Sequence, residues 1–144
     1  MGLPLWALIG MQGFRLPLEL LLHQWWTEGT VPIQITFRSE NLDILTGILA
    51  LAAGVALWRG WLGRRGAGVV NLIGVGLLLN VARIVLRTAP TPFQILTDEP
   101  VLELIYHAPY VWIATVCVAA AFTAHILVFR RLRVDQAASQ RAAA

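Results

Sequence analysis

The sequence has no lysine and few charged residues of any kind. All eleven basic residues are arginines, and charged residues make up only 13% of the 144 positions, whereas soluble domains have about a quarter. Hydrophobic residues make up 58%. This composition argues against a soluble domain and indicates a membrane protein. Because the arginines gather at the ends of apolar stretches instead of forming a stripe, no nucleic-acid partner is expected.

Residues and motifs that identify common chemistries are also missing. The single cysteine, Cys117, lies within an apolar run, which excludes an intrachain disulfide and a cysteine zinc site. The only serines, Ser39 and Ser139, lie at a predicted helix start and in the C-terminal tail, so neither is a candidate buried nucleophile. The sequence also lacks a glycine-rich phosphate loop and a His-Glu-x-x-His motif. It therefore identifies neither a reaction nor a cofactor.

The chain is rich in apolar stretches of the length that crosses a bilayer. A hydrocarbon core of about 30 Å requires about 20 helical residues, and four such stretches occupy most of the sequence. We predict an all-α fold, a four-helix transmembrane bundle in one domain over residues 1–133, followed by a disordered tail over residues 134–144. The predicted spans cover residues 3–26, 41–58, 69–87 and 109–129.

The distribution of arginines predicts how the bundle is oriented. Only Arg38 and the span-end Arg87 lie on one side of the four-span arrangement. The other side carries Arg59, Arg64, Arg65, Arg130, Arg131 and Arg133. Since short cytoplasmic loops are enriched in basic residues, the second side should be cytoplasmic. Both termini are then inside the cell (N-in/C-in), and the two longer loops are outside.

The first span carries three ionisable side chains. Arg15, Glu19 and His23 fall within roughly 80° of one another on a helical projection. Pro17 lies between them and predicts a kink close to the charges, because proline lacks a backbone donor. A charged residue at the centre of a span costs about 2.5 to 3.5 kcal/mol. These side chains should therefore face the bundle interior or water.

Polar residues of the other segments fall at the same outer end of the predicted bundle. The candidate site residues are Arg15, Glu19, His23, Asp43, Asn80, Arg83, Glu99, Glu103 and His107. In one interpretation they are structural ties, with Arg15 paired to Glu19 in its own helix. Arg83 would then meet Asp43 or Glu19 across the bundle. In the other, they line an outward-facing cavity, roofed by the two outer loops, that holds a ligand. The excess of polar groups favours the cavity.

The histidines are the candidate ligands for a metal ion or a haem. Two carboxylate–imidazole pairs have a spacing of four residues, compatible with a metal site: Glu19 with His23, and Glu103 with His107. This spacing is common by chance, and Arg15 competes for Glu19, so no metal site is predicted. Haem held by His23 and His107 has no further support. If the protein is an enzyme, which stays open, acid and base work would fall to Glu19, His23, Asp43, Glu99 or Glu103.

Two buried helix contacts are also expected. His125, near the inner end of the fourth span, should form a hydrogen bond with Asn71 or a backbone carbonyl. Gly47, Ala50 and Gly54 form a row of small residues on one face of the second span. Such a row lets another helix approach closely in lipid, so this face should be buried.

Several motifs together resemble those of a family of uncharacterised bacterial multi-span integral membrane proteins. They are Phe14-Arg15 followed by Glu19, the stretch from Thr36 to Gly47, Asn71 to Gly74, Ala89 to Phe93, and Ala124-His125. The resemblance covers nearly the whole chain. It implies a multi-pass protein of the bacterial inner (cytoplasmic) membrane with an ordered outer polar region, and it carries over no catalytic residue. Members often have additional apolar sequence before the Phe-Arg motif, which leaves open whether a further helix precedes this chain.

Two classes of function follow. The first is an integral membrane protein whose outward-facing polar cavity binds or processes a small or lipid-like ligand. The alternative is a structural accessory subunit of a larger respiratory, photosynthetic or transport complex, with the charges as ties and other membrane subunits as partners. The chain has no inverted repeat, which argues against a transporter.

Overall fold

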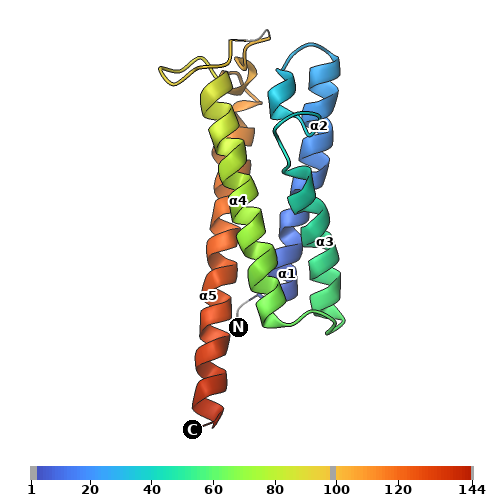
Figure 1. The fold of residues 1–144 in the computed structure, drawn as a ribbon, viewed down its shortest axis with the longest axis vertical. Helices are drawn as coiled ribbons and strands as arrows, with labels where there is room; N and C mark the ends of the chain where they lie inside the picture. Colours follow the sequence, from blue (N-terminus) through green and yellow to red (C-terminus); the bar gives the residue numbers. More distant parts are fainter. Residues whose placement is uncertain (1–2, 98–99, 144) are drawn as a thin grey trace.

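The computed structural model describes residues 3–97 and 100–143, and these are helical with short connections, which confirms the predicted all-α bundle. Both termini and the α3–α4 turn lie at one end of the bundle, and the two longer connections lie at the other (Figure 1). The helical segments are α1 (Leu5–Gly10), η1 (Met11–Phe14), α2 (Arg15–Thr27), η2 (Ile33–Ile35), α3 (Ile44–Trp58), α4 (Arg64–Thr88), η3 (Leu104–Tyr106), η4 (Ile113–Cys117) and α5 (Val118–Ala143).

Within the described residues, three helical stretches are long and apolar enough to cross a membrane, namely Leu5–Thr27, Arg64–Thr88 and Ile113–Arg141. The fourth, α3, has 15 residues and is about 22 Å long, which is shorter than a hydrocarbon core of about 30 Å. The connection before α3 folds down into the bundle, where Val31, Thr36 and Asn41 are each 0% exposed. Non-helical backbone is tolerated at such depth when protein surrounds it. The start of α3 is therefore placed well inside the bundle.

The first span is interrupted close to its charged residues. Between α1 and α2, residues Met11–Phe14 form a tighter 3₁₀ turn. Pro17 explains this irregularity in part, because its missing N–H and its ring disturb the backbone near Gly13. Gln12 within this turn, and Arg15 and Glu19 after it, are all buried, with exposures of 3%, 2% and 1%. The irregular segment thus directs three polar side chains toward the interior.

The short helix α3 packs closely against this first span in the antiparallel direction. A Cβ on Gly47 would lie 2.6 Å from the backbone nitrogen of Leu16, and one on Gly54 would lie 3.1 Å from the Cα of Gly10. Ala50, between them, is buried at 2% exposure. The expected burial of this small-residue face is confirmed, and it sets the register that brings the start of α3 beside α2.

Apolar side chains form two separate clusters at different levels of the bundle. The cluster near the termini contains Leu8, Ile9, Ala50, Ala53, Ala67 and Val128. The cluster near the long connections contains Leu22, Val31, Ile35 and Leu102. Buried polar residues lie between the two, so the bundle has a polar layer enclosed by apolar ones.

The C-terminal segment differs from the expected disordered tail, because α5 continues as a helix to Ala143 and extends beyond the other helices (Figure 1). Its alanine, glutamine and arginine residues are strong helix formers. Asp135 lies 3.3 Å from Arg131 one turn earlier and 3.7 Å from Arg64 of α4. The predicted third and fourth spans, 69–87 and 109–129, correspond to Arg64–Thr88 and to the helix that starts at Ile113.

Candidate functional site

Arg15 lies at the centre of the polar layer and pairs with Asp43, not with Glu19. Its Nε donates to Asp43 Oδ2 at 2.6 Å, and both side chains are buried. The pairing of Arg15 with Glu19 inside one helix, which the structural-tie interpretation contained, is therefore wrong. The inward-folded connection before α3 explains the difference, because it carries Asp43 to the level of Arg15, about 18 Å below the end of α2.

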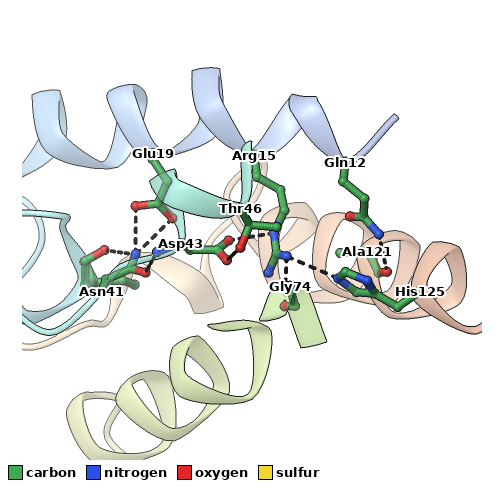
Figure 2. A network of polar contacts seen from close by, with 10 residues as sticks. Gln12, Arg15, Glu19, Asn41, Asp43, Thr46, Gly74, Ala121 and His125 are labelled. Carbon is green, nitrogen blue, oxygen red and sulfur yellow. Dashed lines mark hydrogen bonds and ion pairs between the residues drawn. The ribbon is translucent and has the colours of Figure 1, made fainter. Parts of the chain in front are cut away.

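Glu19 is held by an asparagine from the same connection. Asn41 Nδ2 lies 2.9 and 2.8 Å from the two carboxylate oxygens of Glu19 and also donates to the Ile35 carbonyl at 2.7 Å. Asn41 Oδ1 accepts a hydrogen bond from the Asp43 amide at 3.0 Å. Thr46 donates to Asp43 Oδ1 at 3.0 Å. A continuous polar chain therefore runs from Glu19 through Asp43 to Arg15 (Figure 2).

The chain continues from Arg15 to α4 and α5. Arg15 Nη1 lies 3.4 Å from the Gly74 carbonyl and 3.4 Å from His125 Nε2. His125 Nδ1 lies 2.8 Å from Asn71 Oδ1, which confirms the expected Asn71–His125 hydrogen bond. Since Asn71 Oδ1 is an acceptor, the imidazole proton is on Nδ1 and Nε2 accepts from Arg15. The sequence placed His125 near the inner end of its span and did not predict its contact with Arg15.

Two buried polar atoms of this layer have no partner within the described part of the chain. Gln12 donates through Nε2 to the Ala121 carbonyl at 3.1 Å, but its Oε1 accepts no hydrogen bond. Arg15 uses Nε and Nη1, and its Nη2 has no partner (Figure 2). An unsatisfied buried group costs about 1 to 3 kcal/mol, and more when it is charged. The Arg15 side chain is only 2% exposed, so it lies away from bulk solvent.

A cavity of about 320 Å³ opens above the polar layer on the side of the long connections. Arg15, Glu19 and Asp43 line one end of it, and we call these three residues the charged floor. The rest of the lining is almost entirely apolar and comes from α2, α4, the η4–α5 junction and the two long connections, for example Leu18, Leu78, Val85, Ala114, Val31 and Leu102. The cavity is therefore apolar along most of its lining and carries charged side chains at one end.

The wall formed by η4 is a π-helical turn, Ile113–Cys117. Ile113, Ala114 and Cys117 of this turn line the cavity. Such turns are rare and occur frequently at functional sites. Just before it, Tyr110 meets Trp25 of α2 edge-on, with ring centroids 5.0 Å apart. This aromatic contact joins α2 to the η4 wall at the end of the cavity away from Arg15.

The candidates on α4 lie outside the charged floor. Arg83 Nη2 is 2.8 Å from Glu40 Oε2, and both side chains are largely exposed, at 48% and 42%. Asn80 Nδ2 donates to the Glu40 carbonyl at 2.8 Å. The tie from Arg83 to Asp43 or Glu19, part of the structural-tie interpretation, is wrong, because those two carboxylates are buried and held by Arg15 and Asn41. Arg83 and Asn80 instead fasten that loop to α4.

The histidine candidates are also separated from the charged floor. His23 packs against aromatic rings, with centroids 4.6 Å from Phe37 and 5.2 Å from Trp26. Glu103 and His107 are exposed in the second long connection, in which Leu104–Tyr106 form the short turn η3. Glu99 lies outside the described residues. Across residues 3–97 and 100–143, no group of three or more His, Cys, Asp or Glu side chains is placed to hold a metal ion.

Sequence reasoning missed two residues that position the charges. Asn41 was not among the candidate site residues, yet it holds Glu19. Gly74 makes room for His125, because a Cβ there would lie 2.6 Å from His125 Cε1. The signals for both were present, since an Asn-x-Asp turn offers side-chain hydrogen bonds and a glycine inside a helix often marks a close approach.

Comparison with known proteins finds a family model that matches most of the chain. A family model described as Domain of unknown function (DUF8737) matches residues 4–133. No curated protein and no solved structure matches the sequence. The matched range includes the complete polar chain from Gln12 to His125 and every residue that lines the cavity.

Proposed function

The chain belongs to this family of domains of unknown function, and from that premise we propose that it is an integral membrane protein that binds a small or lipid-like molecule in the cavity above the charged floor. The observation that carries the proposal is the buried Arg15 at the end of an apolar cavity of about 320 Å³, with Nη2 unpartnered among the described residues. Such a volume lies at the lower end of the range for small-molecule sites, about 300 to 1,000 Å³.

A purely structural tie accounts for fewer of these features. Pairing Arg15 with Asp43 requires only one contact at 2.6 Å, and a tie gains nothing from an adjoining cavity. Leaving a charged donor without a partner is costly, and ionisable residues within membrane spans most often mark functional sites. A ligand in the cavity gives a reason for both the space and the free donor.

The arrangement supports binding more than passage across the membrane. The polar chain ends at Asn71 and His125. Beyond it, on the side of the termini, lies the apolar cluster around Leu8, Ile9 and Val128. A charged or polar substrate would meet no hydrogen-bonding groups in that cluster. This closed inner half favours a binding site that opens toward the outer half of the bilayer.

The proposed location is the inner membrane of a bacterium, with the arginine-rich end in the cytoplasm. Three helical stretches are able to cross a membrane, and the arginine asymmetry gives the direction. In this orientation the cavity lies in the outer half of the membrane, where a lipid-soluble molecule can reach it from the bilayer.

Blocking the cavity tests the proposal. Ala114 lines the cavity, so Ala114→Phe should fill it, whereas Val116, in the same turn but 47% exposed, gives the control Val116→Phe. Native mass spectrometry of protein purified in mild detergent should show a bound molecule in the wild type and in Val116→Phe, and its loss in Ala114→Phe. Identical bound molecules in all three proteins would overturn the proposal.

An accessory subunit remains the second candidate because of one surface. A shallow apolar groove of about 460 Å³ runs between α1 and α3, lined by Trp6, Gly10, Leu51, Gly54 and Trp58 among others. Small residues in such a groove allow another transmembrane helix to approach. A Cβ on Gly10 would meet nothing within 4 Å, so Gly10→Leu should fill the groove and release a stoichiometric partner in pull-downs from mild detergent. A monomer in native membranes would exclude this candidate.

A further inference from the structure

We infer that the cavity is built for an uncharged lipid with a single apolar chain, whose head group places a carbonyl or hydroxyl oxygen on Arg15 Nη2. This inference rests on the proposed function and specifies its ligand. It is carried by three features of the same site: the kind of hydrogen-bonding group that is missing, the charge already present on the floor, and the size and depth of the cavity.

The group that the floor lacks is an acceptor. The two oxygens of Glu19 share an N–H of Asn41, whose Nδ2 lies at 2.9 and 2.8 Å from them. Each oxygen of Asp43 has a donor as well, Arg15 for one and Thr46 for the other. Arg15 Nη2, in contrast, carries two N–H donors and has no partner in the described chain. A ligand that completes the site must therefore bring an oxygen that accepts a hydrogen bond.

The charges of the floor disfavour a charged head group at the position beside Arg15 Nη2. The guanidinium of Arg15 is already balanced by Asp43, and Glu19 places a second carboxyl group on the same cavity. A carboxylate or phosphate beside Arg15 would approach two acidic side chains in a medium of low dielectric constant, where like charges repel strongly. An ammonium beside Nη2 would face the guanidinium. An uncharged carbonyl or hydroxyl avoids both repulsions.

The volume and shape suit one apolar chain. About 320 Å³ is small for a ligand site, and two acyl chains would not fit. Arg15 and Trp25 mark the two ends of the lining along α2, ten residues or about 15 Å apart. The walls between them are leucine, valine, alanine and isoleucine side chains. An apolar ligand chain about 15 Å long can therefore lie between Trp25 and the charged floor.

The depth of Arg15 favours the same class. Arg15 is about 18 Å from the end of α2 along the helix, well within the hydrocarbon region of a bilayer. Taking a charged phospholipid head group to that depth carries a large desolvation cost. The desolvation cost of a ketone, alcohol or quinone-like head group is much smaller. Its oxygen also accepts a charge-assisted hydrogen bond from Arg15.

The inference is tested with saturated chains of one length that end in a ketone, alcohol, carboxylate, amine or methyl group. Delipidated protein in detergent is titrated with each compound, and binding is followed by the shift in melting temperature and by native mass spectrometry. We expect the ketone and alcohol to bind about tenfold or more tightly than the alkane, as one hydrogen bond from a charged donor provides. The carboxylate and amine should bind no better than the alkane.

Two variants separate the head-group inference from the proposed function. Arg15→Lys keeps a cation opposite Asp43 but removes the second arm of the guanidinium, so it should lose the preference for ketone over alkane, and Arg83→Lys should keep it. Ala114→Phe should weaken every compound. Tighter binding of the carboxylate or amine, or equal binding of ketone and alkane, overturns the inference and leaves the cavity proposal standing. If no compound binds even to the wild type, both fail. Should Arg15→Lys not fold, the wild-type series alone decides the inference.

Discussion

Arg15 and Asp43 depend on each other because each is buried with its charge. Their side chains are 2% and 5% exposed and lie 2.6 Å apart. Removing one partner leaves an uncompensated charge inside the bundle, which costs about 3 to 5 kcal/mol, whereas removing both often costs far less. We predict that Asp43→Leu alone lowers the free energy of unfolding by this amount, and that the double variant Arg15→Met with Asp43→Leu recovers a large part of it. Denaturation in detergent micelles measures both.

The exposed pair of Arg83 and Glu40 supplies the control. It has a similar length, 2.8 Å, but its side chains are 48% and 42% exposed. Glu40→Gln should therefore lower the free energy of unfolding by about 1 kcal/mol or less. Equal losses at Asp43 and Glu40, or a double variant that is less stable than Asp43→Leu alone, would contradict the prediction.

The sequence identified the charged residues of the site but not how they pair. Arg15, Glu19 and Asp43 could be found because charges within apolar spans must face the interior. The choice between Glu19 and Asp43 as partner of Arg15 depends on where the connection before α3 lies, and this is set by the packing of buried residues such as Val31 and Thr36. Residue spacing along one helix predicts only the pairing of Arg15 with Glu19, because Asp43 lies in a different segment.

At the scale of elements, α4 lies close to both α3 and α5 at Gly74. A Cβ at this position would lie 2.6 Å from His125 Cε1 and 3.2 Å from Thr46 Cγ2. Gly74→Ala should therefore displace His125, weaken its contacts with Asn71 and Arg15, and lower the free energy of unfolding by about 1 to 3 kcal/mol, as for overpacked interiors. Thermal denaturation followed by circular dichroism measures the loss.

Gly76, two residues along the same helix, is the matched control. A Cβ there would meet nothing within 4 Å, and alanine is favoured over glycine inside a helix by about 1 kcal/mol. Gly76→Ala should leave the melting temperature unchanged or raise it slightly. If both variants destabilise the bundle equally, the close approach at Gly74 is not what holds α4 in place.

The existence of the helices follows from apolar length, but several of their ends do not. The sequence predicted a disordered tail, whereas α5 runs to Ala143, because helix propensity and the pairing of Asp135 with Arg131 and Arg64 extend it. The expected second span from residue 41 begins at Ile44, since Asn41 and Asp43 are engaged in side-chain contacts. Such side-chain contacts decide where a helix begins and ends, and a hydropathy pattern does not reveal them.

At the scale of the whole molecule, the layers divide the bundle into two halves with different roles. The half near the termini is closed by the cluster of Leu8, Ile9 and Val128 and holds the helices together. The other half contains the cavity, and the two long connections form its roof through residues such as Val31 and Leu102. The polar layer between them anchors α2, α3, α4 and α5 at one level, so a ligand that contacts Arg15 is coupled to the whole bundle.

The orientation of this layered bundle can be checked with cysteine labelling. The native Cys117 is replaced by alanine, and single cysteines are introduced at Thr97 in the second long connection and at Ser139 in α5, both exposed. Because the end with Arg59, Arg64 and Arg65 should face the cytoplasm, a membrane-impermeant maleimide added to intact spheroplasts should label Thr97→Cys and leave Ser139→Cys unlabelled until the membrane is opened. The reverse labelling pattern would show that the bundle has the opposite orientation. The cavity would then lie in the inner half of the membrane, and its ligand would enter from the cytoplasmic leaflet.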